Sequence, residues 1–142
     1  MQVRVKLTDG APLPKHAKLG DAGLDLTARD SVRIAPHETV MVGTGVAAEI
    51  PEGHVGLCFP RSGLASKRGI NLANCVGVID SGYRGEIKAP LHNISNHPEH
   101  IAEGERVFQL VIVPFVTCEC VEVDELSDTE RGDGGFGSSG RL

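Results

Sequence analysis

Short runs of alternating apolar and polar residues, separated by glycine and proline, set the strongest limit on the fold of this chain. Residues 3–7 alternate with a period of two, the spacing that gives a strand one buried face. Similar β-type patterns recur at 22–28, 31–34, 39–46, 55–59, 87–91, 106–113 and 118–123. The best helical candidate, residues 62–68, is barely two turns long. The pattern therefore predicts an all-β antiparallel barrel or sandwich with at most one short helix.

Charge and hydropathy exclude several classes of partner. The chain has 142 residues, enough for one compact domain, and a formal net charge of −5. A polymeric nucleic acid is therefore not expected as a partner, although local Lys and Arg side chains can still hold a small phosphorylated ligand. No apolar run approaches 18 residues, and residues 1–6 lack the apolar core of a signal peptide. We expect a cytoplasmic protein without a membrane partner.

The four cysteines do not suggest a metal site. Cys58, Cys75, Cys118 and Cys120 lack C-x-x-C spacing, and we expect them to pack as core thiols. Cys118 and Cys120 would lie on one face of a strand. Only 4% of residues are aromatic, so a single copy buries little apolar area and oligomerisation is expected to compensate.

The stretch from 74 to 87 carries the most suggestive chemistry. Apolar β-formers lead to Asp80, a Ser-Gly turn follows, and Tyr83 leads back into a second β pattern. This order predicts a β-hairpin with a carboxylate and a phenol at its tip. An Asp before Ser-Gly often only caps its own backbone, so the stretch does not by itself define a site.

The last sixteen residues differ from the rest of the chain. Residues 127–142 are rich in glycine and serine and cannot fold alone. They are either a solvated tail or a flexible wrap for phosphate groups, because glycine-rich backbone and hydroxyls follow Arg131. They lack the Gly-Lys-Ser/Thr ending of a P-loop.

Five polar, glycine-containing segments together resemble the motifs of the homotrimeric dUTP diphosphatases (dUTPases). They are DAGLDLTA at 21–28, PRSGLAS at 60–66, GVIDSGYRGEI at 77–87, GERVFQL at 104–110 and RGDGGFGSSG at 131–140. Each segment alone is a weak signal. Their shared order and spacing over nearly the whole chain make the resemblance specific.

The resemblance implies an architecture. The family has a jelly-roll-like β-fold of the β-clip kind, so residues 1–126 would form the core. Three chains would share three active sites at their interfaces. Residues 127–142 would form a tail that closes over an active site of another subunit, as lids do in other enzymes.

The resemblance also implies a reaction. Water attacks the α-phosphorus of dUTP, giving dUMP and pyrophosphate, which limits dUTP and supplies dUMP for dTTP synthesis. Asp80 matches the residue that orients and deprotonates this water. Mg²⁺ would bridge the phosphates, and Asp25 matches the carboxylate that holds the ion through coordinated water.

The remaining matches are contacts to the substrate. Those to the phosphate chain are Arg61, Ser62, Gly63 and Gln109, joined by Arg131, Gly137, Ser138 and Ser139 from the tail. Asn74, Val78 and Ile79 would pair with the uracil edge, and Phe136 would stack on the base. Tyr83 would lie against the sugar and exclude a 2′-hydroxyl, and Lys88 matches a further contact.

Two alternative functions remain at this point. A dCTP deaminase shares the fold and the trimeric plan, but a glutamate is expected at its central motif, where this chain has Asp80 followed by Tyr83. A nucleotide-sensing or interaction module without turnover is the second alternative, and an intact Asp80 with a complete tail argues against it.

Overall fold

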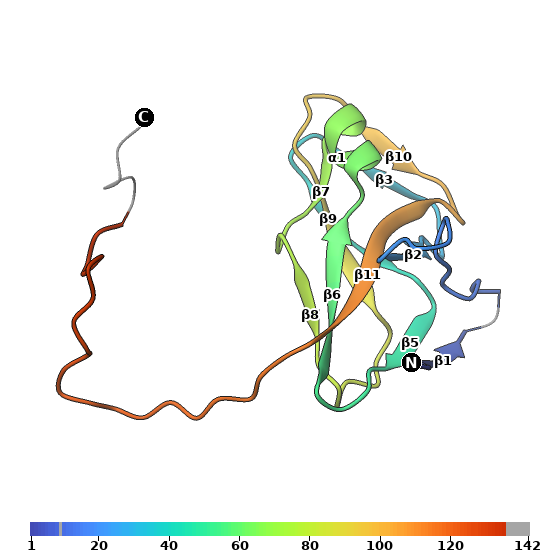
Figure 1. Cartoon of the computed structure of the whole chain (residues 1–142). Coiled ribbons are helices and arrows are strands. Elements are labelled where there is room, and N and C mark those ends of the chain that lie inside the picture. The colour runs from blue at the N-terminus through green and yellow to red at the C-terminus, as the bar shows by residue number, and fades with distance from the viewer. Residues whose placement is uncertain (9, 136–142) are drawn as a thin grey trace.

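The described part of the chain is almost entirely β-structure. The computed structural model describes residues 1–8 and 10–135, which form eleven strands and one short helix (Figure 1). The elements are β1 (Arg4–Leu7), β2 (Leu24–Thr27), β3 (Val32–Ile34), β4 (Thr39–Gly43), β5 (Val46–Glu49), β6 (His54–Pro60), α1 (Ser62–Arg68), β7 (Ile70–Leu72), β8 (Gly77–Ile79), β9 (Lys88–Asn93), β10 (Glu99–Ile101) and β11 (Arg106–Pro114). The all-β prediction with one short helix is confirmed.

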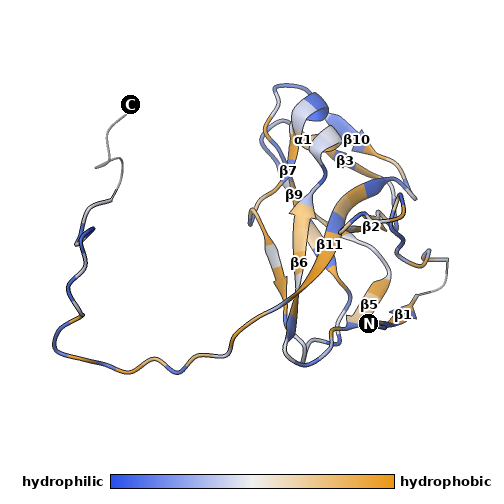
Figure 2. Ribbon diagram, in the orientation of Figure 1, coloured by the Kyte–Doolittle hydropathy of each residue, from blue (hydrophilic) through white to orange (hydrophobic). Residues whose placement is uncertain are grey.

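Antiparallel pairing organises these strands into four small sheets. The largest has the order β2-β11-β6-β8, and a second has the order β4-β9-β7. Two further pairs, β1-β5 and β10-β3, complete the jelly-roll-like body. Between the sheets lies an apolar core of aliphatic residues around Phe108, which is fully buried, and Figure 2 shows hydrophobic residues running along β6 and β11.

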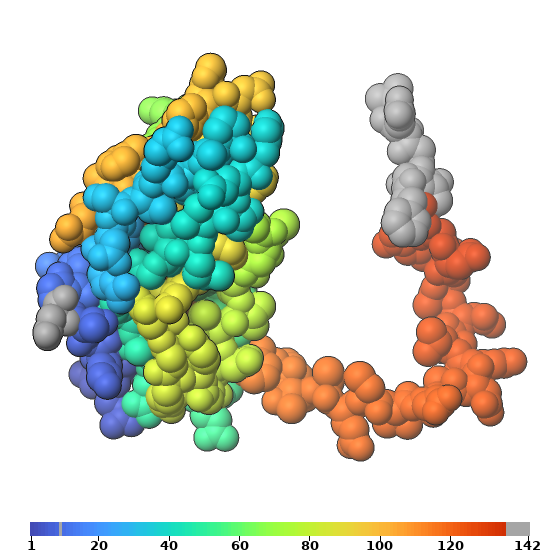
Figure 3. All heavy atoms as spheres, turned by 180° about the vertical axis from the view of Figure 1, so that it is seen from behind, coloured from blue at the N-terminus to red at the C-terminus, as the bar shows by residue number. Residues whose placement is uncertain are grey.

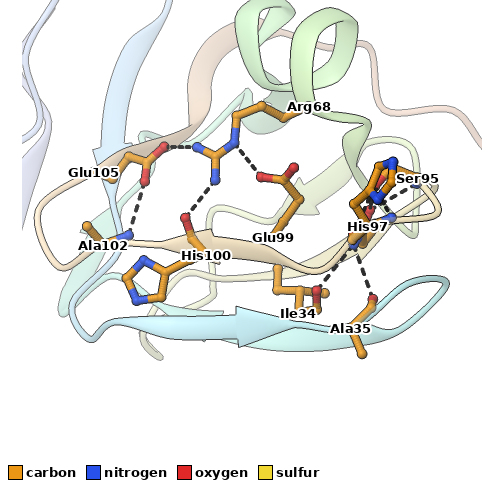
Figure 4. A network of polar contacts seen from close by, with 10 residues as sticks. Ile34, Ala35, Arg68, Ser95, His97, Glu99, His100, Ala102 and Glu105 are labelled. Atoms are coloured by element: carbon orange, nitrogen blue, oxygen red, sulfur yellow. Dashed lines mark hydrogen bonds and ion pairs between the residues drawn. The ribbon is translucent and has the colours of Figure 1, made fainter.

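The helix forms where the sequence predicts it. Leu64 is its buried residue, and Gly69 ends it in the left-handed conformation (φ 67°), which glycine adopts without strain. The last helical residue, Arg68, pairs through Nε with Glu99 at 2.6 Å and through Nη1 with Glu105 at 2.5 Å (Figure 4). These contacts fix the helix beside β10. No helix in the described part of the chain has the length and apolar character needed to span a bilayer.

The predicted strand at 118–123 is wrong. After Pro114 the chain leaves the body as an extended segment without strand pairing through the described residues (Figures 1 and 3). Cys118, Cys120 and Cys75 are exposed, so only Cys58 of the four is a core thiol. An alternating sequence forms a strand only beside a partner strand, and residues 118–123 pair with none in the described part of the chain.

The predicted strand at 39–46 is too long, and three short strands were missed. The strand β4 ends at Gly43, and Thr44 and Gly45, which has a φ of 69°, separate it from β5. The missed strands are β5, of which only Val46 lies in the predicted run, β7 and β10. β7 and β10 have three residues each, too few for a periodic signal.

The predicted hairpin at 74–87 is also wrong. A turn does form at Asp80, whose carbonyl accepts the Tyr83 N–H at 3.0 Å. However, β8 pairs with β6, and β9 pairs with β4 and β7. Ile87 is bonded to the chain around the start of β5. Its N–H donates to the Val46 carbonyl, and its own carbonyl accepts the Thr44 hydroxyl at 2.7 Å. The turn therefore connects two sheets instead of closing one hairpin.

A buried amide joins three segments at the end of the body near α1. Asn93 is fully buried, and its Nδ2 donates to the carbonyl oxygens of Ile34, Ala35 and His97 at 3.2, 3.2 and 2.7 Å (Figure 4). Its Oδ1 accepts the Ser95 N–H at 2.9 Å. One side chain thus satisfies polar groups that burial would otherwise leave unpaired.

We expect Asn93→Ala to destabilise the fold by about 2–4 kcal/mol. The substitution leaves several buried polar groups without a hydrogen-bond partner and creates a small cavity. Urea unfolding measures this loss. The matched control is Asn96→Ala, in the same loop: Asn96 is exposed and contacts only the exposed His37 ring at 3.1 Å. We expect that control to stay within about 0.5 kcal/mol of the unsubstituted protein. Equal losses in the two variants would contradict this role for Asn93.

Candidate active site

The first cluster of predicted site residues surrounds the Asp25 carboxylate. Asp25 lies on β2 opposite Gln109 of β11, and its side chain is only 14% exposed. Its Oδ1 lies 3.0 Å from Arg61 Nε, and its Oδ2 lies 3.0 Å from Arg106 Nη1. Two guanidinium groups therefore hold one carboxylate and leave net positive charge around it.

Gln109 is positioned by the absence of a side chain at Gly23. A Cβ at Gly23 would overlap the Gln109 amide oxygen and come within 3.1 Å of Gln109 Cβ. The Gln109 Nε2 donates to the Pro60 carbonyl at 3.3 Å. The amide thus lies across the backbone of the first motif beside the end of β6.

The helix start completes this cluster. Arg61 is the N-cap residue of α1, where no side-chain cap bond forms and the first turn has no acidic residue. The first backbone N–H groups of a helix lack intrahelical acceptors and suit an anion. The residues of this cluster line one cleft of about 570 Å³. Its lining includes Asp21, Gly23, Asp25, Arg61, Ser62, Gly63 and Gln109.

The second cluster lies around the Asp80 turn. A smaller pocket of about 340 Å³ is lined by Met41, Val78, Ile79, Asp80, Tyr83, Glu86, Ile87 and Lys88. The Asp80 side chain is exposed, and its carboxylate has no hydrogen bond or ion pair within residues 1–8 and 10–135. Asn74 is also exposed and precedes β8. This acid is therefore available to solvent or a ligand.

Sequence reasoning missed two arginines that hold these clusters. Arg106 was given no role in the site, but its Nη1 pairs with Asp25 at 3.0 Å. Arg84 donates through Nη1 to the carbonyl oxygens of Ser81 and Tyr83 at 2.6 and 2.9 Å. Both arginines lie inside the quoted motifs, next to predicted residues, and that position was the available signal.

Glu86 is a third residue that was missed. Its Oε1 accepts the Gly45 N–H at 2.8 Å and lies 3.4 Å from Arg29 Nη1, and its Oε2 lies 3.4 Å from Lys88 Nζ. Partial burial alone would raise the pKa of Glu86, but the Gly45 hydrogen bond and the charges of Lys88 and Arg29 together lower it. Glu86 is thus a structural anion beside the Asp80 pocket.

The two clusters lie toward opposite ends of β6. Ile79, next to Asp80, pairs with Gly56, whereas Arg61 follows the last residue of β6. Arg61 follows Gly56 by five positions along the chain, which corresponds to about 17 Å at 3.3 Å per residue of strand. A triphosphate chain is shorter than this. One subunit therefore does not bring Asp80 and the Arg61 group around one phosphate chain.

The remaining predicted residues lie in the C-terminal segment. Arg131 is on the extended segment beyond the body, where its Nε donates to the Gly134 carbonyl at 3.0 Å. The other predicted tail residues, Phe136, Gly137, Ser138 and Ser139, lie outside the described residues.

The donor set around Asp25 fits a metal that is held mainly by its ligand. Among residues 1–8 and 10–135, no group of three or more His, Cys, Asp or Glu side chains is placed to hold a cation. Mg²⁺ commonly keeps several waters and binds through one or two carboxylates together with substrate phosphates. A single carboxylate beside a phosphate-sized cleft agrees with that mode.

The lowered pKa of Glu86 predicts how stability depends on pH. The stabilisation by its ionised form is complete above the ordinary pKa of 4.5 and is lost as the pH falls through the lower folded value. We expect Glu86→Gln to cost about 0.5–1.5 kcal/mol at pH 7, and less below pH 4.5. Urea midpoints across pH 3.5–7 measure this, with Glu103→Gln, an exposed glutamate, as the control. A cost that does not change with pH would refute the ionic role.

Comparisons with known proteins point to one family. A family model described as dUTPase matches residues 9–140. Two curated relatives are named deoxyuridine 5′-triphosphate nucleotidohydrolase. The protein from a Hydrogenobaculum species is 52% identical, covering 95% of this chain and 94% of the relative, and that from Cutibacterium acnes is 50% identical, covering 90% and 85%. A solved dUTPase of Staphylococcus bacteriophage 80alpha with dUPNHPP aligns with a TM-score of 0.91 at 34% identity, covering 98% of both chains.

Proposed function

The chain belongs to the dUTPase family and hydrolyses dUTP to dUMP, and we propose that it does so at sites shared between the subunits of a homotrimer. Asp80 orients and deprotonates a water molecule that attacks the α-phosphorus in line with the departing pyrophosphate. The exposed carboxylate without a protein partner supports this role, because a general base needs access to water. Asp80 followed by Tyr83 favours this reaction over dCTP deamination.

The first cluster binds the phosphate chain. Arg61, the helix-start residues Ser62 and Gly63, and Gln109 line one cleft, and they offer positive charge and N–H donors. Arg131, Gly137, Ser138 and Ser139 add further donors when the tail closes. These groups bind the departing pyrophosphate and stabilise the charge that develops on it.

Mg²⁺ is the proposed cofactor. When bound, the ion neutralises the triphosphate and polarises its oxygens. Asp25 would hold the ion through coordinated water, and its two arginine contacts orient the carboxylate. The same arginines oppose the remaining negative charge of the substrate.

The second cluster recognises the nucleoside. Backbone groups of Val78 and Ile79, with the Asn74 amide, pair with the uracil edge. The Tyr83 ring lies against the sugar and leaves no space for a 2′-hydroxyl. Lys88 lines the same pocket, and Phe136 stacks on the base from the tail.

The separation of the two clusters within one chain is the observation that carries the proposal. Because about 17 Å of strand lies between them, a nucleotide held by Asp80 of one subunit must meet the Arg61 group of another. A closed trimer places each such pair at a repeated interface and forms three equivalent sites.

The extended C-terminal segment supports the same assembly. It exposes five large apolar residues, Phe115, Val116, Val121, Val123 and Leu126. Apolar side chains in such a row are typical of a segment that packs against another surface. We propose that residues 1–126 form the core and that residues 127–142 form the tail that closes over an active site of another subunit. A cytoplasmic location remains a prediction of the sequence.

Asp80→Asn tests the catalytic role. We expect kcat to fall by about 10²–10⁴-fold, because the amide cannot accept the proton of water, while affinity for a non-hydrolysable dUTP analogue is retained. Steady-state kinetics and calorimetric titration measure the two effects. Asp30→Asn, an exposed aspartate outside both clusters, is the control and retains full activity. Undiminished turnover in Asp80→Asn would refute its role as the base.

Mixing two inactive variants tests the shared site. Asp80→Asn and Arg61→Ala are unfolded together in equal amounts and refolded. If each site takes Asp80 from one subunit and Arg61 from the next, random trimers recover roughly a quarter of wild-type activity, because every mixed trimer contains one intact site. Sites formed within single chains would recover none, and that outcome would refute the shared arrangement.

A further inference from the structure

The Tyr83 ring folds back over the residue two positions after it. Its hydroxyl donates to the Glu86 carbonyl at 2.9 Å. A Cβ built at Gly85 would lie 2.6 Å from Tyr83 Cζ and 3.0 Å from Cε2, closer than atoms can approach. The hydroxyl end of the ring therefore lies directly against the Gly85 backbone. Tyr83 is still 43% exposed, and it lines the pocket that contains Asp80.

The backbone itself does not require glycine at this position. Gly85 is absent from the residues with positive φ, so alanine can adopt its conformation. Instead, the position requires a residue without a side chain. Gly82, in the same turn, also lacks a positive φ, but a Cβ there would have no atom within 4 Å. The two glycines thus offer a matched pair.

The turn around Tyr83 cannot easily move aside. Arg84 Nη1 ties the carbonyl oxygens of Ser81 and Tyr83 together, and its Nη2 lies 3.3 Å from Glu49 Oε1 on β5. Arg4 also pairs with that oxygen, at 2.7 Å. Because this network holds the backbone, a side chain at Gly85 displaces the ring rather than the turn.

We propose that Gly85 is a specificity-determining residue that positions the Tyr83 ring against the sugar. The inference rests on the proposed function, in which Tyr83 excludes a 2′-hydroxyl. The Gly85 backbone supports the hydroxyl end of the ring, so the ring keeps its position and the space for a hydroxyl stays closed. Without that support the ring tilts, and ribonucleotides gain access.

The first test needs no substrate. Tyr83 is the sole tyrosine of the chain, and the chain has no tryptophan, so tyrosine emission reports this ring alone. In the full-length protein, we expect Gly85→Ala to raise acrylamide quenching of that emission toward the value of an exposed tyrosine. Gly82→Ala leaves it unchanged. Unchanged quenching in a folded Gly85→Ala protein overturns the inference.

The second test measures selectivity as the ratio of kcat/KM for dUTP to that for UTP. Packing that excludes a hydroxyl discriminates by about a hundredfold, so we expect Gly85→Ala to lower the ratio by about tenfold and Tyr83→Ala to lower it at least as far. Gly82→Ala retains the ratio. In the double variant, Gly85→Ala adds nothing to Tyr83→Ala, because no ring remains to displace.

The outcomes separate the two ideas. If Tyr83→Ala leaves the ratio unchanged while quenching rises in Gly85→Ala, the proposed sugar contact fails although the ring is positioned as inferred. If Tyr83→Ala lowers the ratio and Gly85→Ala does not, or if their effects add, the role of Gly85 is overturned. If Gly85→Ala fails to fold, Tyr83→Phe provides a substitute test. It keeps the ring on Gly85 and should retain the ratio, whereas a loss equal to that of Tyr83→Ala overturns the inference.

Discussion

The pairing of β11 with both β2 and β6 is the constraint on which the site depends. Gln109 stands opposite Asp25 on one side and Phe59 on the other, so three motifs that are far apart in the sequence meet at one cleft. A slip of one residue between β11 and β2 would place the Gln109 and Asp25 side chains on opposite faces of the sheet. The fully buried Phe108, next to Gln109, opposes such a shift, because it would have to leave the core. Core packing and site geometry are therefore set by the same register.

The protein uses its carboxylates in two different ways. Asp25 and Glu86 are each held by cationic groups, and Glu86 also by a backbone N–H, which fixes both carboxylates in direction. Asp80 has no such partner within residues 1–8 and 10–135 and stands in solvent at a turn. A carboxylate that already accepts strong hydrogen bonds is a poor base, because its lone pairs are engaged. This difference supports the proposed electrostatic roles of Asp25 and Glu86 and the proposed role of Asp80 in proton transfer.

The sequence predicted the elements whose signals are local. Alternation located most strands, and the Gly69 stop defined the helix over 62–68. It failed where pairing partners decide the structure: residues 74–87 look like a hairpin, but β8 pairs with β6 and β9 pairs with β4. The candidate site residues came from the family resemblance, and the structure brings Asp25, Arg61 and Gln109 into one cleft. The sequence did not predict the roles of Arg84, Arg106 and Glu86. Their partners are either distant in the sequence or backbone groups, and residue type gives little information about such contacts.

The single chain leaves two features incomplete, and one assembly completes both. An extended segment with exposed apolar residues has no partner surface within the described part of its own chain. The acid at Asp80 and the cationic cleft at Arg61 are too far apart for one phosphate chain. In the proposed cyclic trimer, the segment gains a partner surface and the acid of one subunit meets the cleft of the next. If the sites are shared in this way, hydrolysis depends on assembly, and an isolated subunit would not cleave dUTP even with every site residue in place.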